Sequence, residues 1–186
     1  MLIENNTDTT APLTSAELIA LRAILERDAI RRVIEGYARG LDRCDEVATR
    51  AAYSDDAYDD HGKFKGNAQE FVTWALAAAK ECSGHQHVLG QSVIAVDGDR
   101  ASCDTYFVYY AEEGRSPVPN VVNALAGRYV DSLERRGADW KISHRVVVID
   151  WSTVWRSDER FPGVDAFVRG AWYPDDQIFK TPQFPV

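Results

Sequence analysis

The sequence predicts an α+β domain in which N-terminal helices cover one face of a cone-shaped, curved antiparallel sheet. Helical patterns occur between residues 14 and 80, and four long runs rich in Val, Ile, Tyr and Phe follow from residue 84 onward. Short turn signals separate these runs, so consecutive strands are expected to pair as an antiparallel meander. A sheet that curls around its helices leaves an apolar interior open at one end, which is the usual place for a small-molecule pocket.

Length, composition and charge fit a single domain. The chain has 186 residues, of which 45% are hydrophobic and 11% aromatic, which excludes a disordered chain. The formal net charge of -8 argues against nucleic acid or an anionic membrane as a partner, because both need clustered Lys and Arg. No stretch approaches the roughly 18 apolar residues of a membrane helix. The chain has three widely spaced cysteines, Cys44, Cys82 and Cys103. Because an odd number cannot fully pair within one chain, this favours reduced thiols and a cytoplasmic location.

The helical half begins after a loose leader, residues 1–13. Thr14 and Glu17 have the spacing of a capping box, so ordered structure is expected to start at Thr14. Apolar residues then recur at spacings of three and four and form one stripe: Ile30, Val33, Ile34, Tyr37 and Leu41. Whether Arg27 and Asp28 divide this segment into two helices stays open. Residues 45–53 fit a short second helix, and residues 67–80 a third, with Asn67 as its N-cap.

The sheet half contains strands over about 85–96, 101–111, 121–135 and 140–151. The aromatic and proline-rich residues that follow are too apolar for a free tail. The chain is therefore divided into the leader 1–13, one domain over 14–152, and a C-terminal extension over 153–186 that packs as a lid over the pocket or as a subunit interface.

Two clusters of polar residues resemble metal sites, but each lacks ligands that such a site needs. His85 and His87 lie two apart on a strand and share a face, but no third His or Cys ligand follows at a suitable spacing. A second cluster lacks the glycine and distal Glu of a calcium loop and is interpreted as a solvated turn: Asp55, Asp56, Asp59, Asp60 and His61.

Asp42 stands at the end of the long helix, on the rim of its apolar stripe. It either ends the helix at the surface or, if the sheet wraps the helix, meets a strand histidine in an apolar cavity. In the second case the pair forms a base, because the carboxylate fixes the imidazole tautomer and stabilises the imidazolium. Tyr37 lies about 140° around an ideal helix from Asp42, and core packing is its simpler interpretation.

Arg145 lies on the last strand, on the same expected side as Val147, Ile149 and Trp151. A guanidinium on so apolar a face needs an anionic partner, because an unpaired buried charge is very unfavourable. Asp104, Asp131 and a substrate oxygen all remain open as that partner.

Three segments, spread over about residues 15–152, carry a resemblance to a known family. They are Tyr37-Ala-Arg-Gly-Leu-Asp42-Arg-Cys-Asp45, His85-Gln-His87-Val-Leu-Gly, and Gly127-Arg-Tyr-Val-Asp131 running on to Trp140-Lys-Ile-Ser-His-Arg145 and Asp150-Trp151. Together they resemble the SnoaL-like branch of the nuclear-transport-factor-2-like superfamily. The resemblance implies a cone-shaped α+β barrel that assembles as a homodimer or homotrimer. Its enzymes include scytalone dehydratase, hexachlorocyclohexane dehydrochlorinase, bile-acid 7α-dehydratase and formaldehyde-releasing lyases, which mostly use no cofactor.

The resemblance also implies a set of site residues. Asp42 and His87 match the catalytic Asp–His dyad of the eliminating members, and Tyr37 and Arg145 match two further site residues of the bile-acid dehydratase type. With Trp151 beside it, Arg145 is expected to contact the substrate. The chain departs from many relatives in having Gln91 in place of Asn. Its second strand histidine, at position 85, is a competitor for the dyad.

These observations predict a cofactor-independent lyase that eliminates water from an apolar, ring-containing small molecule. His87 removes a proton, Asp42 orients it, Tyr37 assists the leaving oxygen and Arg145 anchors the substrate. Three alternatives stay open: a retro-aldol lyase that releases formaldehyde, an isomerase, and a non-catalytic small-molecule-binding module.

Overall fold

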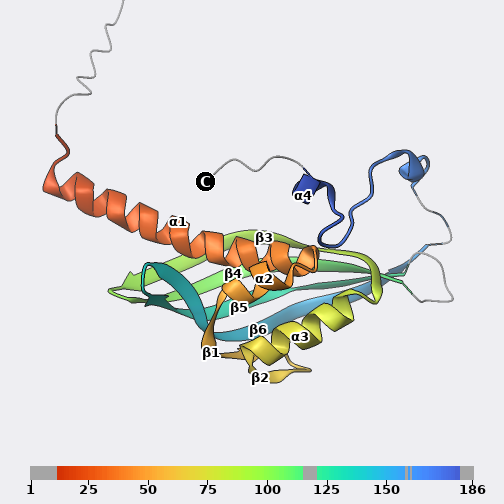
Figure 1. Cartoon of the computed structure of the whole chain (residues 1–186), viewed down its shortest axis with the longest axis horizontal. Helices are drawn as coiled ribbons and strands as arrows, with labels where there is room; N and C mark the ends of the chain where they lie inside the picture. Colours follow the sequence, from red (N-terminus) through yellow and green to blue (C-terminus); the bar gives the residue numbers. More distant parts are fainter. Residues whose placement is uncertain (1–11, 115–120, 158, 160, 181–186) are drawn as a thin grey trace, which may run out of the picture.

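The computed structural model describes residues 12–114, 121–157, 159 and 161–180. These residues form an α+β fold in which one six-stranded sheet has the strand order β2-β1-β6-β5-β4-β3. The sheet curves around the helices and does not close, since β2 and β3 remain as its two edges (Figure 1). The predicted fold class is therefore confirmed.

The first helix, α1 (Ser15–Asp42), is unbroken. Both hydrogen bonds of the predicted capping box are present, from the Glu17 N–H to the Thr14 hydroxyl and from the Thr14 N–H to the Glu17 carboxylate. Burial begins at Ile30, where the helix passes along the sheet, while residues 12–25 are exposed. In Figure 1 the N-terminal end of α1 projects beyond the strands.

Two shorter helices follow, α2 (Glu46–Ala51) and α3 (Ala68–Ala79), close to the predicted ranges. The Asp45 carboxylate caps α2 through the Ala48 N–H, and the Asn67 side chain caps α3. Among the described residues, no helix is long and apolar enough to cross a membrane.

Two strands were not predicted from the sequence, β1 (Tyr53–Asp60) and β2 (Lys65–Asn67). β1 pairs in parallel with β6, which adds a non-meander strand to the sheet. Its acidic composition hides the alternation, because Asp55 and Asp56 face solvent while Ala57 and Asp59 point inward. The interpretation of residues 55–61 as a solvated turn is therefore wrong: Asp59 is fully buried.

The four predicted strands are confirmed and run longer than expected. They are β3 (Cys82–Asp97), β4 (Arg100–Glu113), β5 (Val121–Arg136) and β6 (Asp139–Arg156), each antiparallel to the next. Gly98 and Gly137 have positive φ in the turns that connect them.

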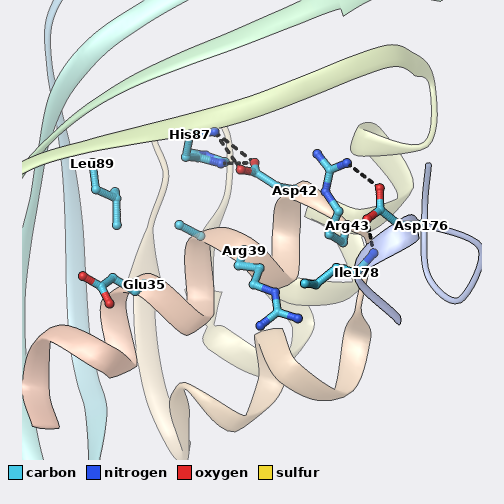
Figure 2. Close-up of a pocket in the computed structure, with 9 residues that line it drawn as sticks. Glu35, Arg39, Asp42, Arg43, His87, Leu89, Asp176 and Ile178 are labelled. Atoms are coloured by element: carbon cyan, nitrogen blue, oxygen red, sulfur yellow. Dashed lines mark hydrogen bonds and ion pairs between the residues drawn. The ribbon is translucent and has the colours of Figure 1, made fainter. Parts of the chain in front are cut away.

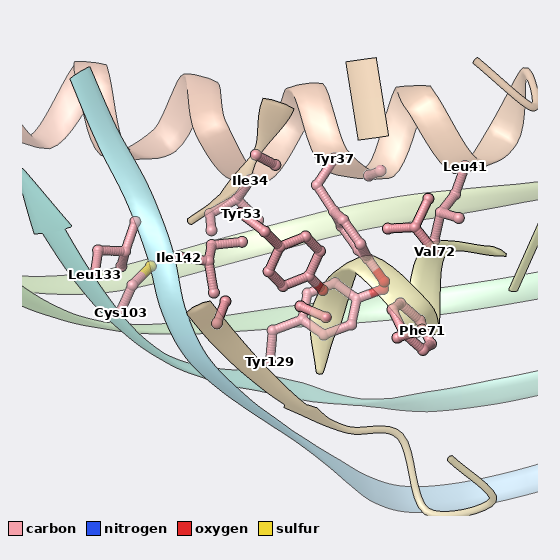
Figure 3. Close-up of a cluster of buried hydrophobic side chains, with 14 of the residues drawn as sticks. Ile34, Tyr37, Leu41, Tyr53, Phe71, Val72, Cys103, Tyr129, Leu133 and Ile142 are labelled. Carbon is pink, nitrogen blue, oxygen red and sulfur yellow. The ribbon is translucent and has the colours of Figure 1, made fainter. Parts of the chain in front are cut away.

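The core lies between α1 and the concave face of the sheet. Ile34, Tyr37 and Leu41 point down from the helix, and Tyr129 and Ile142 meet them from β5 and β6 (Figure 3). Each of these side chains is almost fully buried. Burial of one such side chain stabilises the fold by about 1.5–3 kcal/mol, so this packing fixes where the end of α1 meets the sheet.

The C-terminal extension turns back toward the end of α1. It carries a short 3-10 helix, η1 (Val164–Ala166), and a short helix, α4 (Gln177–Lys180). Arg43, directly after α1, holds it at two points: its side chain pairs with Asp176 at 3.2 Å, and its carbonyl accepts the Tyr173 N–H at 2.6 Å.

Candidate active site

Asp42 and His87 are in direct contact. Asp42 is the last residue of α1, and its Oδ1 lies 2.7 Å from His87 Nδ1 on β3 (Figure 2). Both carboxylate oxygens also accept the backbone N–H of His87, at 3.0 and 2.9 Å. Since a carboxylate only accepts hydrogen bonds, Nδ1 carries the proton and Nε2 keeps its lone pair. Nε2 has no hydrogen-bond partner among the described residues.

His87 borders an apolar chamber of about 390 Å³ on the concave side of the sheet. Most of its wall is aliphatic or aromatic and includes Leu41, Phe71, Phe107, Tyr109, Tyr129 and Val147. Three imidazoles interrupt this wall, from His61, His85 and His87. The chamber therefore combines a largely apolar surface with several groups that can transfer a proton or accept a hydrogen bond.

A second hollow lies on the other side of the same dyad. This outer groove, also about 390 Å³, is lined by α1, by β3 and by Asp176 and Ile178 of the extension (Figure 2). Asp42 lines the outer groove, whereas His87 lines both hollows. The imidazole thus connects a charged, open groove with the apolar chamber.

His85 does not compete with His87 for Asp42. Its Nε2 donates to the Leu41 carbonyl at 3.0 Å, and its ring stacks on Trp172 of the extension with a centroid distance of 5.0 Å. Burial lowers the pKa of His85, which favours the neutral ring. Its Nδ1 is buried without a hydrogen-bond partner in the described part of the chain.

Tyr37 does not approach the dyad. It is fully buried, and its hydroxyl lies 3.3 Å from His61 Nε2. It does not line the chamber, and burial raises its pKa. The structure thus places Tyr37 in the core, in contact with a histidine other than His87.

Arg145 finds its anionic partner in Asp131 rather than Asp104. Nε and Nη2 each donate to this carboxylate at 2.7 Å, and both side chains have 0% exposure. The guanidinium also lies 4.1 Å from the ring centroids of Tyr37 and Tyr129. Arg145 therefore forms part of a buried charged network and does not line the chamber.

Trp151 does not share the face of Arg145, contrary to the expectation from simple alternation. Trp151 pairs with Ala126 and Ile149 with Gly127, so Asp150 is an extra residue in β6. A bulge of this kind reverses which face the following residues occupy. A Cβ on Gly127 would lie 1.9 Å from the Val148 carbonyl oxygen, so the bulge needs glycine here. Trp151 is consequently 49% exposed and lies outside the chamber wall.

Sequence reasoning missed a second Asp–His pair. Asp59 on β1 contacts His61 Nδ1 through Oδ1, and its Oδ2 accepts the Tyr53 hydroxyl at 2.5 Å. His61 stacks on Phe71 with a centroid distance of 4.0 Å and lines the chamber. The i, i+2 spacing of Asp59 and His61 would have revealed the pair if residues 53–60 had been assigned to a strand.

Solved structures with this fold include enzymes of two kinds. A candidate scytalone dehydratase from Novosphingobium aromaticivorans has a TM-score of 0.64 at 17% identity, with 73% of this chain and 91% of that chain covered. A type 2 hexachlorocyclohexane dehydrochlorinase has a TM-score of 0.65 at 20% identity, with 78% and 99% covered. A type 3 dehydrochlorinase from Novosphingobium barchaimii has a TM-score of 0.67 at 18% identity, with 77% and 99% covered.

These likenesses establish the fold. A comparison with curated proteins finds no match. The model of the SnoaL-like domain matches residues 22–146, a range that contains α1 from its third turn, both Asp–His pairs and most of the sheet. The chain therefore belongs to the SnoaL-like family.

Proposed function

We propose that this protein is a lyase that eliminates water from an apolar, ring-containing small molecule, with Asp42 and His87 as its general base and without a cofactor. One observation carries the proposal: Nδ1 of His87 is fixed on Asp42, Nε2 has no hydrogen-bond partner among the described residues, and the imidazole lines the chamber. A base needs this arrangement, because the unprotonated nitrogen must face the substrate.

The proton transfer follows from this geometry. Nε2 takes a proton from a carbon next to an activating group, and the C–H electron pair forms the new double bond as the neighbouring C–O bond breaks. The Asp42 carboxylate stabilises the imidazolium that results. A positioned base of this kind contributes about 10²- to 10⁴-fold, and alignment of the substrate in the chamber supplies much of the remainder.

The chamber supports the substrate class. Its volume of about 390 Å³ lies within the range of small-molecule sites, and its aromatic walls suit a flat ring system. The relatives named as a dehydratase and as dehydrochlorinases are named for eliminations, which start with the same proton abstraction. Isomerisation and retro-aldol release of formaldehyde use the same base and differ only in the bond that breaks afterwards.

A substrate screen separates these reactions. The purified protein is incubated with ring-bearing alcohols and diols, and the products are followed by mass. A loss of about 18 mass units indicates dehydration, a loss of about 30 indicates formaldehyde release, and a changed retention time at constant mass indicates isomerisation. Saturable binding of these compounds with no product would instead support the binding-module alternative.

Substitution of the dyad tests the residues. His87→Gln and Asp42→Asn should each lower turnover by at least about 10²-fold while the thermal melting curve is retained. His144→Gln is the matched control, because His144 is exposed on the sheet and stacks on Tyr58. Wild-type turnover in His87→Gln would remove the basis of the proposal.

We further infer that the C-terminal extension closes the site and that the protein works as a homodimer or homotrimer. The contacts of Arg43 with Asp176 and with the carbonyl of His85 support the first part, because they tie the extension to the strand that carries His87. The exposure of Trp151 on the outer face of the sheet supports the second. Light scattering of the wild type and of Trp151→Ser measures the assembly, and a monomeric wild type would contradict it.

A further inference from the structure

We propose that His61, oriented by Asp59, is a second catalytic residue, which protonates the leaving oxygen while His87 removes the proton from carbon. This inference rests on the proposed function and completes it, because an alcohol is a poor leaving group unless it receives a proton. It also transfers to His61 the role in assisting the leaving oxygen that the sequence-based mechanism gave to Tyr37.

The first support is that the Asp59–His61 pair repeats the construction of the Asp42–His87 dyad. In both pairs a carboxylate oxygen meets Nδ1 of the imidazole. In both pairs a second donor fixes the carboxylate: the backbone N–H of His87 for Asp42, and the Tyr53 hydroxyl for Asp59. Nδ1 of His61 therefore faces its carboxylate, and Nε2, which lies 3.3 Å from the Tyr37 hydroxyl, is the nitrogen that can transfer a proton.

The second support is position. His61 follows β1, near one edge of the sheet, whereas His87 lies on β3 at the other edge. Both line the same chamber, and both ring centroids lie 6.5 Å from that of Tyr129. A ring-shaped substrate in this chamber can therefore contact both imidazoles, as an elimination with separate acid and base requires.

The third support is that Nε2 of His61 is only weakly occupied. Its partner in the described residues is the Tyr37 hydroxyl at 3.3 Å, longer than a usual hydrogen bond between such groups. A substrate oxygen that enters the chamber can replace this contact. Tyr37 itself is less suited to the task, because it is fully buried and lies outside the chamber wall.

The protons and electron pairs of the proposed elimination are all accounted for. The imidazolium of His61 gives its Nε2 proton to the leaving hydroxyl, which departs as water with the electron pair of the C–O bond. His87 Nε2 takes the proton from carbon, and the C–H electron pair becomes the double bond. The substrate thus loses one water, His61 ends neutral and His87 ends protonated. Transfer of that proton to His61 through solvent water restores the starting state.

The charged and titratable groups that face His61 set its protonation. They come from five elements: Tyr37 of α1, Tyr53 and Asp59 of β1, His87 of β3, Tyr129 and Asp131 of β5, and Arg145 of β6. Burial lowers the pKa of His61, with Asp59 acting against it. The acid form is therefore lost already below the ordinary histidine pKa of about 6.5, and turnover should fall as pH rises through this range.

The test uses the alcohol found by the screen and its matched chloride, because chloride leaves without a proton. His61→Gln should lower kcat for the alcohol by at least about 10²-fold, remove this fall of turnover with rising pH, and leave the rate with the chloride nearly unchanged. His87→Gln should lower both rates, because proton abstraction is common to both. Asp59→Asn should act on the alcohol in the same direction as His61→Gln and serves as the second variant, with melting curves recorded for each.

Each result has one meaning. Equal losses for alcohol and chloride in His61→Gln, or an unchanged rate and pH profile, would show that His61 has a structural role only. Full activity of His87→Gln would instead contradict the proposed function itself. A binding readout is independent of turnover: with ¹⁵N-labelled histidine, added 2-naphthol should shift the Nε2 resonances of both His61 and His87. A shift at His87 alone, or no shift at either, would overturn the proposal.

Discussion

Removal of one partner from the buried Arg145–Asp131 pair should be strongly destabilising. Both side chains have 0% exposure, and two hydrogen bonds of 2.7 Å join them. Asp131→Asn keeps the shape but leaves the guanidinium with no carboxylate, and loss of one member of such a pair costs about 3–5 kcal/mol. We expect the lower end, about 3 kcal/mol, because the amide oxygen of Asn still accepts one hydrogen bond.

Urea unfolding followed by tryptophan fluorescence measures this difference. With a slope of about 2 kcal/mol per M, a loss of about 3 kcal/mol moves the midpoint down by roughly 1.5 M. The matched control is Asp104→Asn, since Asp104 pairs with Arg128 at 3.1 Å at the surface, with side chains 36% and 29% exposed. Such a pair contributes about 0–1 kcal/mol.

The double variant Arg145→Met with Asp131→Leu should recover most of the lost stability, because apolar residues of similar volume replace such buried pairs with little loss. A midpoint for Asp131→Asn no lower than that of Asp104→Asn would refute the reasoning, as would a double variant less stable than the single one. The double variant also tests the substrate contact that the family resemblance implied for Arg145. If that contact exists, the double variant stays folded but loses binding of ring compounds.

Three further predictions concern the frame of the site. Gly127→Ala should lower the free energy of unfolding by about 1–3 kcal/mol, because the added Cβ would lie 1.9 Å from a backbone oxygen. Gly36→Ala in α1, where the added Cβ meets open space, should raise it by about 0.5–1 kcal/mol in the same melting experiments. Asp176→Asn weakens the contact of the extension with Arg43. Proteolysis within residues 164–180 and the association of ring compounds should both become faster. If both rates are unchanged, the extension does not close the site. Burial lowers the pKa of His85 in the folded protein, so on acidification the histidine of the unfolded chain is protonated first. The free energy of unfolding should therefore decrease as the pH drops below about 6.5. His85→Gln should make this decrease smaller.

The long elements were predictable because their patterns are long. The stripe from Ile30 to Leu41 and the four runs of β-branched and aromatic residues repeat often enough to outweigh single exceptions. β1 is short, and it places Asp59 at an inward position where an apolar residue is expected. With a carboxylate at this position, and only the small Ala57 at the inward position before it, the period of two is not visible, so the strand and the buried carboxylate were missed together.

The candidate site, too, was predicted only in part from the sequence. The contact between Asp42 and His87 was anticipated through the family resemblance, since the residue pattern alone left open whether Asp42 ends the helix at the surface or meets a strand histidine. Trp151 was misplaced because a bulge depends on a neighbouring strand that the sequence of β6 does not specify. The contact of Arg43 with Asp176 joins residues far apart in the chain, and no local pattern predicts such a contact.

The buried charges beside the chamber give the second Asp–His pair its physical rationale. Tyr53 donates to Asp59 at 2.5 Å and lies 3.5 Å from Nη1 of Arg145, so the chain of contacts runs from His61 to Asp131 without a break. An apolar core of the same volume would be about as stable, since buried ion pairs seldom gain more than they lose in desolvation. What an apolar core would lack is a rigid carboxylate behind His61. The network therefore makes most sense as the support that holds one imidazole in the chamber wall, just as the end of α1 holds the other.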